Sequence, residues 1–390
     1  MAIIIAVFFW LRLFHLEERM NFSMDQGLFS LRASEIWENK EISLIGPEAS
    51  MMVEGKHFFQ GPATYYLSVV LMLLGNWDPV RAGVGIVILN GLGLIFLYLT
   101  LKIWFKEEEA KIGIILFTFL PLSIKYSNFI WNPNFLLIFC SLFLYIFSKA
   151  VKNNKFIWYG LAGLMAGICW QFHYQFTLVI IGSLMFLVFR KTNFKNIFIY
   201  ILGILIGFWP LIVFEFRNNF YNLGLIIKWL TINKENHFKL EEHYLIGFLP
   251  IVIAILVYLF KRINRVIVYF LMAVVIVMGV RFSLKTEEWN YKDKIKVVNL
   301  IKQKGCENFE IAQTITGDTR SYDLRYLLKI NQCQPLEVDK YPEAKKLYLI
   351  SKKQVEEESV WEVRSMEKFE IMSKTIINNQ IMLYELVKKN

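Results

Sequence analysis

The sequence predicts an α-helical polytopic membrane protein with about nine transmembrane helices, outer juxtamembrane helices and a small C-terminal α/β domain. Three observations lead to this class. The 390-residue chain is 56% hydrophobic with a mean hydropathy of +0.42, well above the values of an ordinary soluble domain. Its apolar residues gather into repeated runs near the length that crosses a bilayer. Only 19% of the residues are charged, and these lie mainly between the runs and after residue 284.

The membrane part is expected to cover residues 1–284. Crossing the hydrocarbon core takes about 20 apolar residues, and the runs that approach this length are 80–104, 111–125, 134–150, 156–171, 175–190, 196–214, 244–260 and 264–283. The opening run, Ala2 to Phe14, is shorter, and we interpret it as a clipped first helix or an uncleaved signal anchor. A removable signal peptide is disfavoured, because no small-residue cleavage site followed by a soluble domain comes after this run.

Basic residues cluster in every second loop between these runs. The clusters are Lys102, Lys106 and Lys111; Lys149, Lys152 and Lys155; Arg190, Lys191 and Lys195; and Lys261, Arg262 and Arg265. The intervening short loops, 125–134 and 171–175, hold one Lys and no Arg. By the positive-inside rule, the N-terminus lies on the cytoplasmic side of the plasma membrane and the C-terminus lies outside. Residues 16–62, 215–243 and 285–390 are then expected to be extracytoplasmic.

The charge balance supports a membrane protein rather than a nucleic-acid binder. Residues 1–284 hold 24 Lys and Arg against 16 Asp and Glu, whereas residues 285–390 hold 19 against 17. A positive excess confined to loops between apolar runs indicates membrane orientation. No nucleic-acid partner is expected, because the charges form no phosphate-binding footprint.

The stretch Ala63–Leu74 is apolar but too short to span. We interpret it as a juxtamembrane helix on the outer face. If it crossed the bilayer instead, every later loop would change sides.

Residues 285–390 are expected to form a separate extracytoplasmic α/β domain. Apolar spacing predicts a helix over Trp289–Lys304. The predicted strands are Phe309–Thr314, Lys346–Ile350, Val360–Arg364 and Ile381–Val387. Cys306 and Cys333 either form a disulfide, which an oxidising compartment would permit, or stay two unrelated buried thiols.

Asp25 is the first candidate for chemistry. It lies just beyond the opening apolar run, where a carboxylate can act as a general base or bind a divalent cation. The alternative is an N-cap for the helix that begins near Gln26. His57, in the same long loop, could bond a phosphate or ligate a metal, or could simply be solvated. Asp25 and His57 are the ligands of any metal site, and no other cofactor is expected.

Polar and aromatic residues also gather at later outer boundaries. Asn132 and Asn134, next to Trp131, can hydrogen-bond sugar hydroxyls or cap the helix that follows. Gln171, His173, Tyr174 and Gln175 form a second group, in which the aromatic residue also fits an interfacial belt. A third group has Glu215 and Arg217, where the Arg suits a lipid phosphate. The alternative for this third group is an ion pair that anchors a helix end.

The order of these segments resembles that of a known superfamily. Asp25, Gly61-Pro62-Ala63-Thr64-Tyr65-Tyr66 and Ser127–Asn134 are similar to segments of the GT-C membrane glycosyltransferases, specifically glycosyltransferase family 39, which includes protein mannosyltransferase-like and aminoarabinose transferase-like proteins. Gln171–Tyr174 and Phe214–Arg217 resemble one branch of it. The resemblance covers roughly residues 16–220.

The resemblance implies a membrane glycosyltransferase that takes a sugar from a polyprenyl phosphate and acts on the outer face. Asp25 would be the catalytic carboxylate, the base that deprotonates an acceptor hydroxyl on a glycan, lipid or protein. Substrate contacts are expected from His57, Gln60, Tyr65, Tyr66, Trp131, Asn132, Asn134, Gln171, His173, Tyr174, Glu215 and Arg217. Many members have a second Asp where this chain has Asn132 or Asn134, which argues against a two-carboxylate mechanism here.

Two other functions stay open. One is a non-catalytic transporter or flippase of a lipid-linked glycan, and the other is a glycan ligase or polymerase of the same architecture. Transporters place ionisable groups near the bilayer midplane, whereas the polar groups of this chain gather at the outer boundary. This distribution favours surface chemistry.

Overall fold

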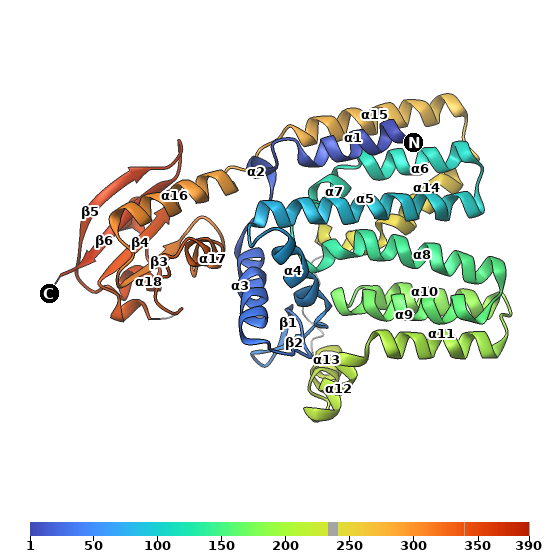
Figure 1. Ribbon diagram of the computed structural model, residues 1–390, viewed down its shortest axis with the longest axis horizontal. Helices are drawn as coiled ribbons and strands as arrows, with labels where there is room; N and C mark the ends of the chain where they lie inside the picture. The colour runs from blue at the N-terminus through green and yellow to red at the C-terminus, as the bar shows by residue number, and fades with distance from the viewer. Residues whose placement is uncertain (233–240, 339, 390) are drawn as a thin grey trace. The chain divides into compact units, whose positions relative to one another are not determined.

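The computed structural model describes residues 1–232, 241–338 and 340–389 (Figure 1). The chain divides into two compact units that alternate along the sequence. The first comprises Met1–Phe14, Glu35–Asn76 and Arg81–Lys285, and the second comprises His15–Ser34, Trp77–Val80 and Thr286–Asn390. The second unit thus includes two segments that the sequence analysis assigned to the membrane domain. Part of the predicted 215–243 loop, residues 233–240, lies outside the described residues.

The first unit is built mainly of apolar helices, the form that satisfies every backbone polar group within lipid. They are α1 (Ala2–Leu13), α4 (Ala63–Leu74), α5 (Pro79–Trp104), α6 (Glu107–Phe119), α7 (Pro121–Lys125), α8 (Phe135–Asn153), α9 (Phe156–Phe172), α10 (Phe176–Phe189), α11 (Phe194–Gly207), α12 (Trp209–Arg217), α13 (Tyr221–Ile232), α14 (Leu249–Phe260) and α15 (Arg265–Ser283). Within this unit α8, α9 and α11 lie side by side, and α14 and α15 both pack on α6 (Figure 1).

Only some of these helices are long enough to cross a bilayer alone. Among the described residues, four apolar stretches pass by length and composition: Pro79–Trp104, Asn132–Asn153, Glu242–Phe260 and Arg265–Ser283. The pair α11 and α12, bent by 65°, would make a fifth if it is one span. Helices α1, α4, α9 and α10 are apolar but shorter. The count of about nine spans and the sidedness of the loops therefore stay predictions.

Glycines let α9 and α11 approach to backbone contact. A Cβ on Gly163 would lie 2.0 Å from the Tyr200 carbonyl oxygen, and one on Gly203 would lie 2.4 Å from the Gly160 carbonyl oxygen. Gly167 and Gly207 repeat the pattern four residues further along each helix. Small residues at this spacing are typical of membrane helix pairs, because close packing replaces the missing hydrophobic force. The contact runs to the ends of both helices, where the predicted site residues begin.

Arg12 of α1 is a fully buried cation that the apolar pattern concealed. Its guanidinium donates to the Phe117 and Thr118 carbonyl oxygens at 3.2 and 3.1 Å and to Ser123 Oγ at 2.9 Å. Helix α6 ends here because the extended residue Leu120 precedes a proline. Arg12 therefore satisfies carbonyl groups at the negative end of α6 and ties α1 to α6 and α7.

The predicted polar loop 16–62 is largely ordered. It contains α2 (Leu16–Arg19), α3 (Met24–Asn39) and an antiparallel hairpin of β1 (Glu48–Val53) and β2 (Lys56–Phe59). Glu54 and Gly55 turn the hairpin with φ of 51° and 74°, the left-handed values that a two-residue turn needs. Ala49, Val53 and Phe58 of the hairpin form a small core with Leu225 of α13.

The C-terminal residues of the second unit form a four-stranded sheet in the order β3-β4-β6-β5. Its strands are β3 (Phe309–Gln313), β4 (Lys346–Ser351), β5 (Phe369–Ile376) and β6 (Met382–Lys388), and its helices are α16 (Tyr291–Lys304), α17 (Tyr322–Ile330) and α18 (Trp361–Arg364). Strands β3 and β4 are parallel and the other pairs are antiparallel. The second unit also has two short 3₁₀ helices, η3 (Tyr341–Glu343) and η4 (Val355–Glu357). Two others in the described part of the chain, η1 (Asn132–Asn134) and η2 (Glu242–Phe248), belong to the first unit.

Two strand assignments from the sequence differ from the structure. The predicted strand Val360–Arg364 is wrong, since Trp361–Arg364 is the helical turn α18. A four-residue apolar alternation fits one helical turn as well as a strand. The edge strand β5 was not predicted; most of its residues are exposed, so it shows little apolar signal. The other three strands and the helix α16 lie where they were predicted.

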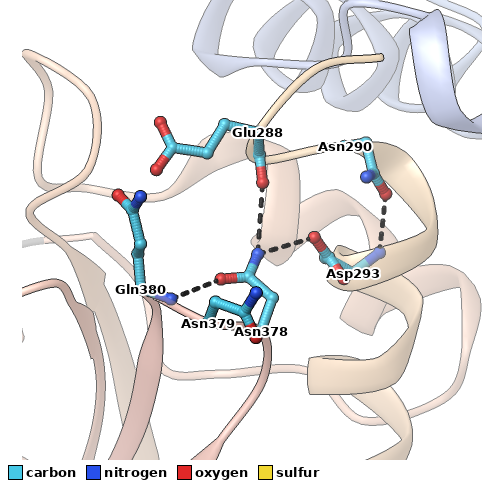
Figure 2. A pocket seen from close by; sticks show the side chains of 6 residues that line it. All are labelled: Glu288, Asn290, Asp293, Asn378, Asn379 and Gln380. Carbon is cyan, nitrogen blue, oxygen red and sulfur yellow. Dashed lines mark hydrogen bonds between the residues drawn. The ribbon is translucent and has the colours of Figure 1, made fainter.

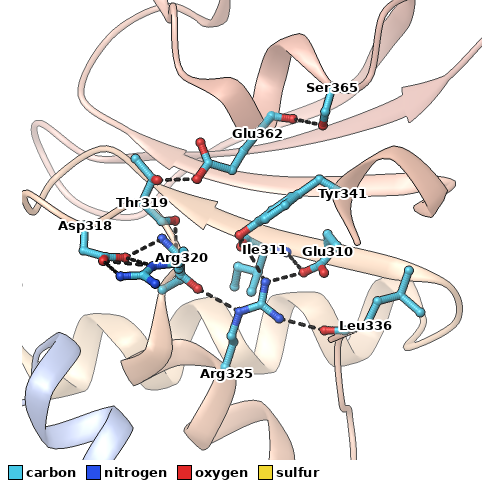
Figure 3. Close-up of polar contacts among 11 residues, drawn as sticks. Glu310, Ile311, Asp318, Thr319, Arg320, Arg325, Leu336, Tyr341, Glu362 and Ser365 are labelled. Carbon is cyan, nitrogen blue, oxygen red and sulfur yellow. Dashed lines mark hydrogen bonds and ion pairs between the residues drawn. The ribbon is translucent and has the colours of Figure 1, made fainter. Parts of the chain in front are cut away.

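A buried ion pair connects β3 to α17 (Figure 3). Arg325 pairs with Glu310 and also donates to the Arg320 and Leu336 carbonyl oxygens, both at 2.7 Å. The Tyr341 hydroxyl accepts from the same guanidinium at 3.1 Å. Burying two charges is costly unless their remaining hydrogen-bonding groups are occupied. Here they are largely occupied, so α17 is fixed firmly against the sheet.

Cys306 and Cys333 form a disulfide across 27 residues, while Cys140 and Cys169 are buried free thiols. Closing a loop of this length is expected to stabilise the second unit by about 3–4 kcal/mol, because it restricts the unfolded chain. We expect the C306A/C333A variant to lose this amount in urea unfolding, and wild-type protein to lose the same amount when reduced. Reductant should not change the variant further. An unaltered wild-type transition in reductant would contradict the prediction.

The contact between α9 and α11 can be tested at Gly203. Gly203→Val places atoms where the Gly160 carbonyl already lies, so the helices must separate. The expected cost is about 1–3 kcal/mol, seen as a lower Tm of the purified protein in detergent. Gly182→Val is the matched control, because a Cβ there meets nothing within 4 Å. Equal Tm values for the two variants would argue against a close helix pair.

Candidate functional site

The last turn of α9 joins the returning end of the first long loop to α11. Gln171 is 6% exposed, and its main-chain oxygen accepts from Gly61 N at 3.0 Å. Its side chain accepts from Ala63 N at 3.2 Å and donates to the Gly207 carbonyl oxygen at 2.6 Å. A Cβ on Gly61 would lie 2.5 Å from the Gln171 side chain, so this approach requires glycine. The predicted segment 60–66 is therefore held against the ends of α9 and α11.

Gln60 and Asn132 add a third predicted segment to this meeting point. Asn132 Nδ2 donates to Gln60 Oε1 at 2.7 Å and to the Phe172 carbonyl oxygen at 3.1 Å. Both side chains are buried, with exposures of 5% and 7%. Because the Asn132 amide bonds to the Gln60 side chain and to the Phe172 carbonyl, it connects the segments around Gln60, Asn132 and Phe172.

Asn134 is fully buried, but its side chain does not cap α8. Its Nδ2 instead donates to the Phe129 carbonyl oxygen at 3.0 Å. This bond closes the turn that places Trp131 and Asn132. The capping alternative for Asn134 is therefore wrong, since the helix begins through the 3₁₀ turn η1.

Trp131 and His173 belong to an aromatic cluster completed by residues that the sequence analysis missed. Trp131 stacks on Tyr126 at 5.9 Å and meets the His243 ring edge-on at 5.0 Å. The His173 ring lies 6.0 Å from His243 and 5.5 Å from Tyr244. His243 and Tyr244 lie in η2, and the polar sequence Glu241–Tyr244 directly before an apolar run could have indicated them.

His173 is uncharged at neutral pH. Burial lowers its pKa to about 3, and repulsion from His243 lowers it further in the same direction. Its Nδ1 accepts from Gln175 N at 3.2 Å. The proton of the neutral ring is therefore assigned to Nε2, which makes His173 a neutral hydrogen-bond donor.

Tyr174 and α13 hold β2 in place. The Tyr174 hydroxyl donates to the Phe59 carbonyl oxygen at 2.5 Å, and burial raises its pKa above the usual range. Asn222 Oδ1 accepts from Phe59 N at 2.8 Å. His57 lies in β2, where its Nδ1 is 3.0 Å from the Ala49 carbonyl oxygen across the hairpin.

The two tyrosines of α4 differ in their contacts. The Tyr66 hydroxyl donates to the Ser43 carbonyl oxygen at 2.8 Å and accepts from Ser43 N at 2.9 Å. Tyr66 therefore fixes the loop before the hairpin. Tyr65, in the same first turn, is partly buried.

Glu215 and Arg217 lie in α12 but form no ion pair with each other within the described part of the chain. Glu215 accepts from Asn222 N at 3.2 Å and from Leu223 N at 3.1 Å, which caps the start of α13. The alternative of a Glu–Arg anchor is therefore wrong. Arg217 is exposed in the last turn of α12 and has no ion-pair partner among residues 1–232, 241–338 and 340–389.

Asp25 lies in the first turn of α3, in the second unit. The helix start is capped without it: Gln26 Oε1 accepts from Ser23 N at 3.0 Å and from Ser23 Oγ at 2.7 Å. The bond from Ser23 N to the Gln26 side chain is one half of a capping box. The N-cap alternative for Asp25 is therefore wrong, because α3 begins at Met24 and Asp25 lies within its first turn.

No metal site is evident in the part of the chain that the structure describes. No group of three His, Cys, Asp or Glu side chains in it could hold an ion. Asp25 belongs to the second unit and His57 to the first, so the predicted Asp25–His57 metal site stays a prediction.

The second unit contains an open pocket of about 430 Å³ (Figure 2). Asn378 donates across it to the Glu288 carbonyl oxygen at 3.1 Å and to Asp293 Oδ2 at 2.9 Å. Glu288 also pairs with Lys352 at 2.7 Å. The polar groups here mainly fasten the turn before β6 to the start of α16.

Comparisons with known proteins gave a match to one family model and matches to solved structures. Residues 60–214 match the family described as "Dolichyl-phosphate-mannose-protein mannosyltransferase". No curated protein matches the sequence. Two crystal structures of ArnT from Cupriavidus metallidurans are similar to this structure. The form bound to undecaprenyl phosphate gives a TM-score of 0.60 at 10% identity, and the apo form gives 0.61 at 11%. Each comparison covers 98% of this chain and 96% of the other.

At such low sequence identity, the similarity to ArnT shows a shared fold only. The family match covers the segment that contains the Gly61–Tyr66, Ser127–Asn134 and Gln171–Tyr174 motifs. The predicted fold class and resemblance are therefore confirmed: the chain has the fold of the GT-C membrane glycosyltransferases, and residues 60–214 match their protein mannosyltransferase family.

Proposed function

We propose that this protein transfers a sugar from a polyprenyl-phosphate donor to an acceptor hydroxyl at the extracytoplasmic face of the membrane. The observation that carries the proposal is the match of residues 60–214 to a family whose description names dolichyl-phosphate-mannose. The structurally similar ArnT binds undecaprenyl phosphate in its crystal. Both carriers are polyprenyl phosphates, so this chemical class is the donor we assign.

The reaction we propose is a single displacement at the anomeric carbon. The acceptor oxygen forms a bond to C1 of the sugar while the bond from C1 to the lipid phosphate oxygen breaks. The phosphate leaves with the electron pair, and the configuration at C1 inverts. Asp25 takes the proton of the acceptor hydroxyl as general base.

Among the basic side chains of the first unit, Arg217 is the best counterion for the departing phosphate. Lys125 is already paired with Glu242, and His173 is neutral at physiological pH. Arg217 is exposed, and its guanidinium can bind a phosphate through two parallel hydrogen bonds. His173 would contribute a neutral hydrogen bond from Nε2.

The remaining candidate residues divide into two roles under this proposal. Trp131, with His243 and Tyr244, offers aromatic surface for a sugar ring or prenyl chain. Gln60, Asn132, Gln171, Tyr66 and Glu215 use their polar atoms on the protein, so we assign them to holding the segments in place. His57, Tyr65, Tyr174 and Asn134 stay candidate substrate contacts.

The general base is tested by Asp25→Asn, which keeps the shape of the side chain but removes its basicity. We expect sugar transfer from a purified polyprenyl-phosphate donor, with an envelope extract as acceptor, to fall by about 10²–10⁴-fold. Asp318→Asn, in the loop before α17, is the control: Asp318 is half-buried and pairs with Arg320 within the second unit, and the variant should keep its activity. Transfer at the wild-type rate by Asp25→Asn would remove Asp25 from the mechanism. Donor that crosses vesicle membranes intact, without transfer, would support the transporter instead.

The neutrality of His173 predicts a pH effect on stability. Its folded pKa of about 3 is below the unfolded value near 6.5, so the unfolded chain binds a proton that the folded protein excludes. The stability that this neutral ring contributes is complete above about pH 6.5 and is lost as the pH falls toward 3. We expect the Tm of wild-type protein to fall more steeply over this range than that of His173→Gln. Parallel Tm curves for the two proteins would contradict this prediction.

A further inference from the structure

The segment that carries Asp25 packs on the C-terminal residues within the second unit. Glu287 N donates to the Glu18 carbonyl oxygen at 2.9 Å, and Lys292 pairs with the Glu18 carboxylate at 3.3 Å. The Phe22 ring lies edge-on to Tyr291 at 5.8 Å and 6.1 Å from Tyr326. Glu18 and Phe22, which precede Asp25 in the chain, therefore pack on α16, α17 and the segment just before α16.

Lys294 of α16 connects the Phe22 segment to α17. Its ammonium is 2.7 Å from Asp323 Oδ2, and the two side chains are 2% and 0% exposed. The same ammonium donates to the Phe22 carbonyl oxygen, three residues before Asp25. Asp323 Oδ1 accepts from Gln313 Nε2 at 2.7 Å, and Gln313 Oε1 accepts from Trp289 Nε1 at 3.0 Å. Because removing either partner of a buried ion pair leaves an uncompensated charge, Lys294 is held in place by Asp323, and its bond to the Phe22 carbonyl restricts the chain there.

Gly27 fixes the other side of Asp25 by backbone contact. A Cβ on Gly27 would lie 2.3 Å from Asp323 N and 2.4 Å from the Tyr322 carbonyl carbon. These are main-chain atoms at the start of α17, which the Arg325–Glu310 pair holds to the sheet (Figure 3). Further along α3, Lys329 Nζ donates to Ser34 Oγ at 2.9 Å. The first turn of α3 therefore rests on α17 with no room for a side chain between them.

We propose that Lys294, Asp323 and Gly27 are positioning residues for Asp25, and that the C-terminal α/β domain serves to hold the base in place. The inference rests on the proposed function, in which Asp25 removes the acceptor proton. A base works only within hydrogen-bond reach of its proton, and a misplacement of about 1 Å can cost 10²-fold in rate. Contacts at Phe22 and Gly27 enclose Asp25 from both sides along the chain. Under this proposal, the α/β domain supports catalysis by positioning Asp25 and needs no contact with either substrate.

The first experiment compares two glycine-to-alanine variants of the full-length protein. Gly27→Ala pushes the first turn of α3 away from α17, and we expect kcat for sugar transfer to fall by about 10²-fold while KM for the lipid donor changes little. Gly182→Ala, a helical position where a Cβ meets nothing within 4 Å, should keep both constants. Each variant is also combined with Asp25→Asn. If Gly27 acts through Asp25, Gly27→Ala has no further effect once the carboxylate is gone.

The second experiment uses Lys294→Met, which removes the bond to the Phe22 carbonyl, with Lys296→Met as control. Lys296 lies in the same helix and donates to the Ile377 carbonyl oxygen, within the α/β domain. We expect Lys294→Met to lower kcat and Lys296→Met to leave it unchanged. Lys294→Arg should recover part of the loss. This pair keeps the test decisive if Gly27→Ala does not fold.

The outcomes separate the inference from the function on which it rests. A wild-type kcat in both Gly27→Ala and Lys294→Met, or losses that multiply with that of Asp25→Asn, would overturn the positioning role while leaving Asp25 as the base. Wild-type transfer by Asp25→Asn alone would overturn the base and the positioning role together. Loss of kcat confined to the active Asp25 background supports the inference.

Discussion

The first unit depends on a backbone approach that only glycine permits. Gly61 lies so close to Gln171 that a single methyl group would separate them, and Gly163 and Gly203 allow the same closeness between α9 and α11. Gln171 then reaches both the returning loop and the end of α11 through one side chain. Each of its buried bonds is worth about 1 kcal/mol, but leaving a partner unsatisfied costs more. The positions of Gln60, Ala63 and Asn132 follow from this one junction.

The electrostatics around Trp131 and His173 are set by burial more than by charge. His173 is kept neutral, Lys125 is paired with Glu242, and Glu215 is occupied by two backbone N–H groups. Under the proposed function, a leaving phosphate would therefore meet the neutral His173 and the exposed Arg217. This arrangement suits a leaving group that is already stable as an anion, for which orientation matters more than strong charge compensation.

The helical membrane fold class could be predicted from the sequence, because a helix that crosses a bilayer must be apolar along its length. The order of Gln60–Tyr66, Trp131–Asn134 and Gln171–Tyr174 also indicated that these segments act together, and the structure joins all three through Asn132 and Gln171. What the sequence could not reveal is whether an amide bonds to protein or to ligand. Gln60 and Asn132 looked like sugar-binding groups, yet they bond to each other.

Other features depend on contacts far apart in the chain. No local pattern connects Phe22 and Gly27 to Lys294 and Asp323, so the partnership of the Asp25 segment with the α/β domain was missed. His243 and Tyr244 were missed for a similar reason, because they join the Trp131 cluster only through tertiary packing. Arg12 was missed because it lies within an apolar run. It is a buried cation that bonds to the Thr118 carbonyl oxygen and so connects α1 to α6.

The interleaved makeup of the second unit has a consequence for biosynthesis. Residues 15–34 emerge from the ribosome early, but the α16 and α17 residues that complete their surroundings follow only after about 250 further residues, some tens of seconds later at about 5–20 residues per second. During this interval the nascent chain must carry an uncovered Phe22 and an unpaired α3 start while the helices of the first unit insert. A ribosome that stops early would release a membrane-inserted product in which the Asp25 segment has never met its support.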